Sequence, residues 1–353
     1  MQFYHNVKHI RGNNKMIKDV IIKLSKKENL TYEEAKESMK EIMSGESTPI
    51  QISAYLTALT IKGETIDEIT ASAQVMREYS QKVITENDTL EIVGTGGDNS
   101  NSFNISTAAA FIISCCGINV AKHNNRSASS KCGSADVLEA LGVNINLDAK
   151  KVKKILDKIN ICFLFAQNYH SAMKYVAPIR KELGIKTIFN ILGPLCNPAN
   201  ASIELMGVYD ESLVEPLALV MKNLGVKKGM VVYGMDKLDE ISISDKTKIS
   251  EILDNGSIRT YNISPKDFGY DIYNKDEIVG GDSIHNANLL KGVLSGKLKG
   301  AKRDIVCLNS GAAIYLGKKA SSIKDGVKMA EEIIDSGKAI EKLNIFINET
   351  NSI

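Results

Sequence analysis

Polar residues placed ahead of apolar periods predict that the beginning of the chain is helical. Thr31, Thr48 and Thr65 are each followed three residues later by Glu or Gln, which is the capping-box pattern that satisfies the free N–H groups of a helix start. After Thr48, apolar residues recur at intervals of three and four, as they do along one face of a helix. We therefore predict an all-helical unit over residues 16–85.

From about residue 89 the pattern changes to short apolar runs that alternate with helical stretches. The runs that we predict to be strands are LEIVG, INVAK, ICFLF, IELMGVY, GMVVYG and DIVCLN. The stretches that we predict to be helices are 105–116, 134–141, 170–183, 211–224 and 308–316. This alternation predicts an α/β fold with a mostly parallel central sheet covered by helices on both faces. Residues 245–300 lack a clear period, and we expect a less regular hairpin-and-loop excursion there.

Composition and charge narrow the classes of partner. The chain of 353 residues is 43% hydrophobic and 24% charged, which is typical of globular proteins, and its length suits one large domain or two ordinary ones. Its 44 basic and 42 acidic residues leave a net charge of +2, which argues against nucleic acid or a membrane surface as a partner. No apolar run approaches the roughly 18 residues of a membrane span.

The cysteines and the N-terminus bear on where the protein works. Six cysteines occur without a C-x-x-C pair, which indicates a reducing compartment, so we expect a cytoplasmic protein. Residues 1–15 carry basic residues but no apolar signal region. We expect them to form a loose N-terminal extension.

The first candidate for chemistry is the glycine-rich stretch VGTGGD at 93–98, directly after a predicted strand. Glycine lets the backbone approach an anion, and the start of the next helix offers free N–H groups, so such turns commonly hold phosphate. A tight strand-to-helix turn without a ligand fits the stretch as well, because it has neither the Rossmann spacing nor the end of a P-loop. Asn104, with Ser106 or Thr107, can either cap the helix or hold a phosphate or its metal ion.

A second polar loop, KHNNRSASSKCGSAD, follows the next predicted strand. It gathers cations, amides and hydroxyls before it enters a helix at Ser134. Ligands of parallel sheets bind beyond the carboxyl ends of the strands. Two such loops at neighbouring strand ends supply donors for several phosphate oxygens, which is more than packing requires. A polar surface loop with a serine cap is the alternative.

Two further charged features could complete such a site. Asp239 and Glu240 are adjacent acids near a strand end, and carboxylates suit Mg²⁺, which shares its ligands with substrate phosphates. A solvated acidic turn is the alternative. Arg180, in a predicted helix, can grip a carboxylate through two parallel hydrogen bonds or can be an exposed helix charge. The sequence has no zinc-type Cys/His cluster and no nucleophile elbow, so this equipment suits a phosphorylated substrate with Mg²⁺ better than acyl transfer.

At these residues the chain resembles a known family. GTGGD, NIST, KHNNRSASSKCGSADVLEALG, APIRKELGIKTIFNILGPLCNP and GMDKLDE closely resemble the anthranilate phosphoribosyltransferases, in the family order, and the resemblance extends from about Met16 to the C-terminus. It implies a small helical domain, with a later segment at about 168–195 packed on it, and a larger α/β phosphoribosyl-binding domain at 86–353. It also implies a homodimer formed through the helical domain.

The resemblance further implies a reaction in tryptophan biosynthesis. The 5-phosphoribosyl group of phosphoribosyl pyrophosphate (PRPP) passes to the amine of anthranilate, giving N-(5-phosphoribosyl)anthranilate and pyrophosphate, with the help of Mg²⁺. No catalytic base is assigned, because the aromatic amine is uncharged at neutral pH and positioning supplies much of the rate.

The same resemblance assigns site residues motif by motif. The implied PRPP-binding residues are Gly94, Gly97, Asp98, Ser102, Asn104, Ile105, Ser106, Thr107, Lys122, His123, Asn124, Asn125, Arg126, Ser127, Ala128, Ser129, Ser130 and Ser134. The implied anthranilate-binding residues are Gly94, Asn125 and Arg180. The implied Mg²⁺ ligands are Ser106, Asp239 and Glu240.

Two departures from the family pattern bear on this interpretation. Asn124 stands where the family usually has glycine; asparagine tolerates positive φ, but its side chain could narrow the anthranilate site or alter acceptor preference. Ser171 stands where the family often has proline, which we expect to loosen a helix start.

Three other functions compete with this one. A pyrimidine nucleoside phosphorylase shares the architecture but carries a basic glycine-rich motif that this chain lacks. A nucleic-acid-binding relative would need a basic stripe. Transfer to a different aromatic acceptor stays open because of Asn124.

Overall fold

The computed structural model describes residues 16–127 and 131–352. The predicted extension at 1–15 lies outside the described residues, as do three predicted PRPP-binding residues, Ala128, Ser129 and Ser130. In the part of the chain that is described, no helix is both long and apolar enough to cross a bilayer.

The chain divides into two compact units. One unit combines the described residues up to Ser80 with His170–Cys196, and we call it the helical unit. The other combines Gln81–Tyr169 with the residues from Asn197 onward, and we call it the α/β unit.

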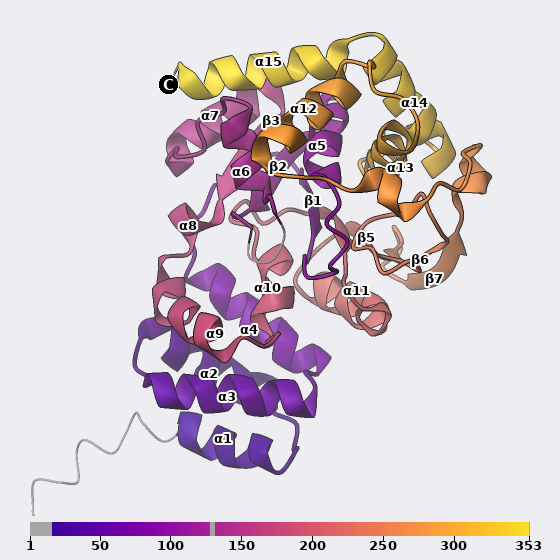
Figure 1. Cartoon of the computed structure of the whole chain (residues 1–353). Helices are drawn as coiled ribbons and strands as arrows, with labels where there is room; N and C mark the ends of the chain where they lie inside the picture. The colour runs from indigo at the N-terminus through magenta and orange to yellow at the C-terminus, as the bar shows by residue number, and fades with distance from the viewer. Residues whose placement is uncertain (1–15, 128–130, 353) are drawn as a thin grey trace, which may run out of the picture. The chain divides into compact units, whose positions relative to one another are not determined.

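The helical unit begins with four helices, and the predicted capping boxes fix the starts of the last three. These helices are α1 Met16–Ser25, α2 Tyr32–Ser44, α3 Pro49–Lys62 and α4 Ile66–Glu78 (Figure 1). The side chains of Thr31, Thr48 and Thr65 accept from the backbone N–H three residues on, and the Glu or Gln there accepts in return from the threonine N–H. All three predicted capping boxes are therefore confirmed. The predicted apolar face of α3 is also buried, through Ile52, Tyr55, Leu56 and Leu59.

The later segment of the helical unit is broken into short helices. They are η1 Ser171–Tyr175, α9 Ala177–Leu183 and α10 Phe189–Leu195, where η marks a 3₁₀ helix. The prediction of one continuous helix over 170–183 is therefore wrong. Pro178 has no N–H to donate to the preceding turn, so the α-helix has to begin anew in its neighbourhood.

Contacts within the helical unit tie this segment to the first helices. Arg77 Nε, on α4, donates a hydrogen bond to the backbone oxygen of Leu195 at 2.6 Å. The ring of Tyr175 packs over Gly45, where a Cβ would lie only 2.6 Å from the ring. Gly45 also has φ +80° at the end of α2, so both the backbone angle and the contact require glycine.

The α/β unit is built on one seven-stranded sheet of order β3-β2-β1-β4-β5-β6-β7. Its strands are β1 Thr89–Gly94, β2 Asn119–Asn124, β3 Ile161–Phe165, β4 Ile203–Gly207, β5 Lys228–Gly234, β6 Thr247–Ile252 and β7 Ile258–Ile263. The neighbours from β3 to β5 pair in parallel, whereas β6 and β7 pair antiparallel. The predicted mostly parallel sheet is confirmed, and β6 and β7 form the hairpin expected within residues 245–300.

Helices pack on this sheet and on one another. They are α5 Ile105–Cys115, α6 Ser134–Ala140, α7 Ala149–Ile159, α8 Ala166–Tyr169, η2 Glu211–Leu213, α11 Val214–Asn223, η3 Pro265–Phe268, η4 Lys275–Ile278, α12 Ser283–Leu294, α13 Ala301–Leu316, α14 Ile323–Asp335 and α15 Lys338–Asn351. The run DIVCLN, predicted to be a strand, lies inside α13, so that prediction is wrong. A short apolar run that is buried on all sides has no period by which helix and strand can be told apart.

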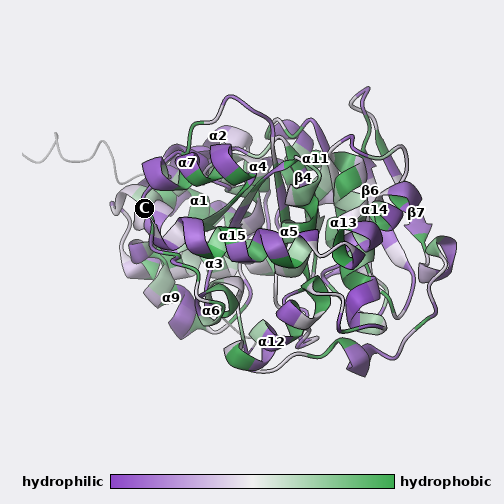
Figure 2. Cartoon of the chain, turned by 90° about the horizontal axis from the view of Figure 1, so that it is seen from above, coloured by the Kyte–Doolittle hydropathy of each residue, from purple (hydrophilic) through white to green (hydrophobic). Residues whose placement is uncertain are grey.

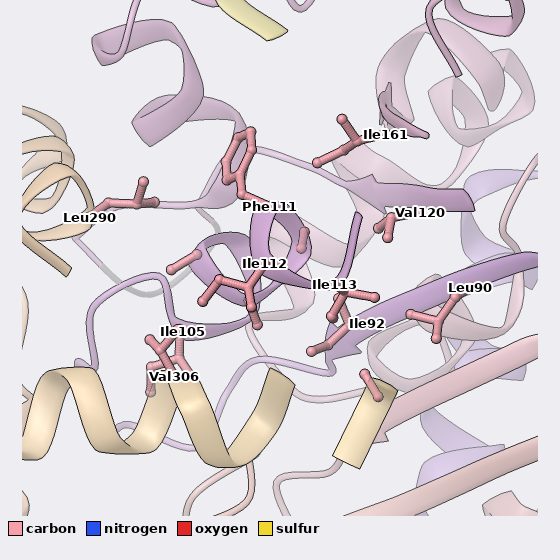
Figure 3. Packing of buried hydrophobic residues seen from close by; sticks show 14 of the residues in the cluster. Leu90, Ile92, Ile105, Phe111, Ile112, Ile113, Val120, Ile161, Leu290 and Val306 are labelled. Carbon is pink, nitrogen blue, oxygen red and sulfur yellow. The ribbon is translucent and has the colours of Figure 1, made fainter. Parts of the chain in front are cut away.

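Helix α5 is the centre of the core of the α/β unit. It contacts β1 and β2 on one side and α13 and α15 on others. Figure 3 shows Ile113 of α5 beside Ile92 of β1, and Ile105 beside Val306 of α13. Hydrophobic residues concentrate on the strands and on α5, while α7 and α14 present hydrophilic residues outward (Figure 2). The buried helix and sheet together fix the loops that leave the ends of the strands.

Candidate active site

The predicted site residues of the α/β unit gather where its parallel strands end, which we call the carboxyl edge. The glycine-rich loop leaves the end of β1, the basic loop leaves the end of β2, and the acidic pair follows β5 (Figure 1). In the register of the sheet, Gly94 of β1 lies opposite Gly207 of β4. Segments far apart in the sequence therefore meet at one edge of the sheet.

The glycines of β1 and β4 make room for the acidic loop. A Cβ on Gly94 would collide with the carboxylate of Asp239, and a Cβ on Gly207 would collide with its backbone. Gly96 has φ +69°, and its N–H donates to Asp239 Oδ2 at 2.7 Å. Gly97 also has a left-handed φ of +77°. The glycine-rich turn is thus shaped around an acid that lies 143 positions later in the chain.

The acidic pair is buried rather than solvated. Asp239 and Glu240 are 9% and 8% exposed. The Asp239 N–H donates to Asp98 Oδ2 at 3.3 Å, and the Ser106 N–H donates to Glu240 Oε1 at 3.2 Å. The alternative of a solvated acidic turn is therefore wrong.

Burial changes how readily these acids lose their protons. Burial, followed by the charges of Asp98 and Glu240, raises the pKa of Asp239 well above its ordinary value. Burial raises the pKa of Glu240 to about 7, although the charge of Lys122 opposes that shift. Ionising this cluster is costly unless a cation accompanies it.

The donors at this edge fit Mg²⁺. Within the described residues, no group of three or more His, Cys, Asp or Glu side chains forms a ready metal cage. Mg²⁺ rarely uses such a cage; it is commonly held by one or two carboxylates and keeps waters and substrate oxygens as its other ligands. Asp239 and Glu240 are two buried carboxylates, and Glu240 accepts from the Ser106 N–H. A divalent cation would offset the burial and the charge repulsion that raise their pKa values.

Lys122 lies inside this cluster. It is 2% exposed, and its Nζ donates to the backbone oxygen of Ile92 at 2.6 Å and to Ser106 Oγ at 3.1 Å. Burial lowers its pKa, and the charges of Glu91, Glu240 and Asp239 oppose that change. The Ser106 hydroxyl oxygen therefore accepts a hydrogen bond from Lys122, and the Ser106 backbone N–H donates one to Glu240.

The next residue of β2, His123, is also buried, at 5% exposed. Its backbone N–H donates to Glu91 Oε2 at 2.8 Å, so a side chain of β1 holds the end of β2. Burial raises the pKa of Glu91 to about 8, with the charge of Lys122 opposing.

Asn124 ends β2 in extended conformation. It is absent from the described residues that have positive φ, so the tolerance for positive φ expected at this position is not used. Its Oδ1 instead accepts from the Asn125 N–H at 2.8 Å. Asn125 in turn accepts from the Arg126 N–H at 2.8 Å and from Gln167 Nε2 at 3.3 Å. The side chain that replaces the usual glycine therefore stabilises the first turn of the basic loop.

Arg126 folds back onto its own loop. Its guanidinium pairs with Asp136 at 3.0 Å and Glu139 at 2.5 Å, and it lies over the ring of Phe165 at 5.5 Å. The Ser127 N–H donates to Asp136 Oδ2 at 3.0 Å. In this arrangement Arg126 shapes the loop, and its role in PRPP binding stays a prediction.

The two loops are joined at the start of α5. Thr107 Oγ1 donates to Ser134 Oγ at 3.1 Å, which links the helix after the glycine-rich loop to the helix after the basic loop. Ile105 is buried in the core. Asn104 occupies the N-cap position of α5, but its side chain makes no capping bond, so the capping alternative is not realised by this side chain. Asn104 Nδ2 donates instead to the backbone oxygen of Cys132 at 3.3 Å.

Asn286 was missed by sequence reasoning, and it holds Asn104 in place. It is 2% exposed; its Nδ2 donates to Asn104 Oδ1 at 3.0 Å, and its Oδ1 accepts from the Gly281 N–H at 2.7 Å. Ser102 pairs with Val279 in an isolated bridge beside this contact. The sequence carries no signal for Asn286, since α12 itself was not predicted.

Other missed residues carried weak signals. Asn197 Nδ2 donates to Glu91 Oε2 and, at 2.7 Å, to the backbone oxygen of Ala121. Asn197 lies inside the family-like stretch LGPLCNP, and Glu91 is an acid within an otherwise apolar strand. Gly207 could have been found as a glycine inside a predicted strand, which often marks a close backbone approach.

Arg180 belongs to the helical unit, on α9. It is half-buried, its guanidinium lies 5.5 Å from the centre of the Phe189 ring, and its Nη2 is 3.5 Å from Asn190 Oδ1. Burial lowers its pKa. No described Asp or Glu forms an ion pair with it, so this is a partly desolvated cation without a carboxylate of its own.

Comparison with known proteins shows which family has this arrangement of domains. The model described as the helical bundle domain of a glycosyl transferase family matches residues 18–80, and the model of its a/b domain matches residues 86–340. Anthranilate phosphoribosyltransferase of Methanobrevibacter smithii is 58% identical over 337 residues, which is 96% of this chain and 100% of that protein.

Solved structures of anthranilate phosphoribosyltransferases are also similar to this chain. The crystal structure of anthranilate phosphoribosyltransferase (TrpD) from Thermus thermophilus has a TM-score of 0.89 and 38% identity, and the match covers 94% of this chain and 99% of that one. The Saccharomyces cerevisiae enzyme in complex with PRPP and Mg has a TM-score of 0.89 and 29% identity, covering 96% and 99%.

Proposed function

The chain belongs to the anthranilate phosphoribosyltransferase family, and we propose that it transfers the 5-phosphoribosyl group of PRPP to the amine of anthranilate. The products are N-(5-phosphoribosyl)anthranilate and pyrophosphate, and the reaction belongs to tryptophan biosynthesis. The observation that carries the proposal is the carboxyl edge, where a glycine-rich loop and a donor-rich loop lie beside a buried acidic pair. The relative whose structure holds PRPP and Mg supports it.

We assign the phosphoribosyl donor to the α/β unit. The glycine-rich loop with the start of α5, and the basic loop up to Ser134, would bind the diphosphate and the ribose. Asn104, Thr107 and Ser134 are held by one another or by buried neighbours, so their polar atoms are positioned before the substrate arrives.

The acidic pair would hold Mg²⁺ together with Ser106. When bound there, Mg²⁺ supplies positive charge to the diphosphate, whose negative charge grows as the bond to the ribose breaks. Lys122 Nζ donates to Ser106 Oγ, so its charge lies next to the same oxygen. The positive end of the helix dipole at the start of α5 would add to this stabilisation.

The acceptor needs positioning more than activation. As the ribose carbon loses the pyrophosphate oxygen, the amine nitrogen of anthranilate forms the new bond and afterwards loses one proton. We assign the carboxylate of anthranilate to Arg180, since this half-buried guanidinium has no carboxylate partner among the described residues. Gly94 and Asn125 complete the proposed acceptor residues.

We further propose a homodimer in the cytoplasm. In the helical unit, Ile22 of α1 and Ile50 and Ile61 of α3 are 56%, 82% and 67% exposed. Apolar side chains with more than half of their surface exposed favour association through the helix faces that carry them.

The test of the function is a fluorescence assay that follows the loss of anthranilate in the presence of PRPP and Mg²⁺. We expect turnover in the full chain. We expect Arg180→Ala to raise the KM for anthranilate about ten- to hundredfold, because a charge-assisted pair is lost, and to leave the KM for PRPP nearly unchanged. Arg180→Lys should recover only part of the loss, since an ammonium cannot make the planar two-point contact.

Lys181→Ala is the matched control, because this exposed cation follows Arg180 on the same helix. An unchanged KM and kcat for anthranilate in Arg180→Ala would discard the assigned role. A rise in the KM for PRPP alone would move Arg180 to the phosphate site. Absence of turnover in the wild-type chain would overturn the function itself.

A further inference from the structure

A cavity of about 520 Å³ lies where the parallel strands of the α/β unit begin, which we call the amino edge. Its lining includes Asp88, just before β1, and the first residues of β2, β4 and β5, which are Asn119, Ile203 and Lys228. The 6 residues of β1 separate this edge from the carboxyl edge, which at ~3.3 Å per residue is about 20 Å. The cavity is therefore separate from the residues assigned to PRPP.

Lysines outnumber acids around this cavity. Four lysines line it, and the acids among its lining residues are Asp88 and Asp254. Each of these acids already has a close partner: Lys227 lies 2.7 Å from Asp88, and Lys318 lies 2.9 Å from Asp254. The positive charges of Lys228 and Lys319 are left in excess.

Lys228 is the main indication of a ligand, because it is buried beside the cavity. Its side chain is only 10% exposed, and its Nζ lies 3.7 Å from Asp254, which is beyond hydrogen-bond length. Its other described partner is the ring of Tyr315, whose centre is 4.7 Å from Nζ. An ammonium carries three N–H donors, and a buried one that makes only these weak contacts can still accommodate an anionic acceptor.

Lys319 is the second excess cation. It is exposed, it lines the same cavity, and it forms no ion pair with a described residue. Lys228 and Lys319 belong to different elements, the start of β5 and the turn after α13, so an anion between them would be held from two sides.

The size and the apolar part of the lining indicate an organic ligand. A cavity of about 520 Å³ lies within the range of small-molecule sites and is far larger than a single ion requires. Ile118, Ile203 and Leu316 also line it, and they offer contacts to carbon atoms. We propose that the amino-edge cavity binds a small organic anion with two or more negative charges, carried by carboxylate or phosphate-ester groups.

Calorimetric titration of the full chain with citrate and with glycerol 2-phosphate, in Mg²⁺-free buffer, tests this proposal. We expect at least one of these probes to bind, and we expect Lys228→Met and Lys319→Met each to weaken that binding about tenfold or more. Lys319 is exposed, so its variant keeps the test valid even if Lys228→Met folds poorly.

Two control variants locate the binding event. Lys297→Met removes an exposed lysine that does not line the cavity, and Lys131→Met removes one from the basic loop at the carboxyl edge. Neither should change the event that the cavity variants weaken. Binding that is insensitive to Lys228→Met and Lys319→Met, binding weakened as much by either control, or no binding of either probe would overturn the proposal.

Discussion

The two edges of the central sheet carry opposite charge excesses, and they differ in how those excesses are solvated. At the carboxyl edge, Asp239 and Glu240 lie near Lys122, and Asp98 lies beside Asp239. All of these except Asp98 are buried. At the amino edge, lysines outnumber acids, but most of the pairs there are open to water, as in Lys227–Asp88, whose side chains are 68% and 55% exposed. The same kind of imbalance therefore has different consequences at the two edges.

Burial explains the difference. Water screens the amino-edge charges, and such exposed pairs contribute little to stability. At the carboxyl edge water is excluded, so the pKa values of Asp239 and Glu240 rise and the pKa of Lys122 falls. A buried cluster whose charged forms are disfavoured in this way is prepared for a charged ligand. At the amino edge, Lys228 is the one charged side chain among the described lining residues that is buried.

The largest expected effect comes from neutralising the carboxyl edge. Asp239→Asn with Glu240→Gln should lower Mg²⁺-dependent turnover by about two to three powers of ten, because charge stabilisation by a bound metal is worth several kcal/mol. Without Mg²⁺ the variant should melt no lower than the wild type, since two buried acids have been replaced by neutral groups of the same shape.

The matched control neutralises the other edge. Asp88→Asn with Asp254→Asn removes two acids that lie at the amino edge, and turnover should change little. Steady-state kinetics at limiting Mg²⁺ measure both variants. Equal losses in the two double variants would break the comparison, and normal activity in the carboxyl-edge variant would remove the metal assignment.

A smaller effect is expected from the amide pairs that each edge contains. Asn286→Ala removes the donor to Asn104 and should raise the KM for PRPP about tenfold, because the half-buried Asn104 side chain loses its partner and its position. The change in kcat should be smaller. The control is Asn119→Ala at the amino edge, which removes the acceptor for Asn160 Nδ2 at 2.7 Å. It should leave the KM for PRPP unchanged, and a similar rise in both variants would assign Asn286 a general structural role.

Local signals predicted the elements of this molecule well, and long-range contacts account for what they missed. The capping boxes at Thr31, Thr48 and Thr65 need only a few neighbouring residues, and all three are present. The bond from Asn286 to Asn104 spans 182 positions, and nothing near either residue encodes it.

The errors have the same origin. All residues of DIVCLN are buried within α13, so its apolar residues are not confined to one face and show no period that distinguishes a helix from a strand. Asn104 is equipped to cap α5, but a buried partner from another helix uses its side chain instead. The amino-edge cavity was not predicted, because its lysines come from separate segments that only the sheet brings together.

The contrast that separates the two edges most directly is the dependence of stability on pH without Mg²⁺. At the carboxyl edge, burial raises the pKa of Glu240 from 4.5 to about 7 and raises that of Asp239 as well. Between the ordinary pKa values and the raised ones, the folded chain keeps protons that the unfolded chain has lost. The free energy of unfolding therefore falls as pH rises, by at most about 1.4 kcal/mol per pH unit for each proton.

The amino edge has the opposite sign and a different window. A hydrogen bond from Lys227 lowers the pKa of Asp88 below 3.8, and one from Lys318 does the same for Asp254, so the stability that these acids contribute is present above pH 3.8 and is lost only as pH falls below it. Between about pH 4.5 and 7, therefore, the carboxyl edge should respond and the amino edge should not. The measurement is the melting temperature in EDTA across that range. The difference between wild type and Asp239→Asn/Glu240→Gln should grow as pH rises, whereas the difference for Asp88→Asn/Asp254→Asn should stay constant. A constant difference for the carboxyl-edge variant would mean that its acids titrate normally, and the contrast between the two edges would then rest on position alone.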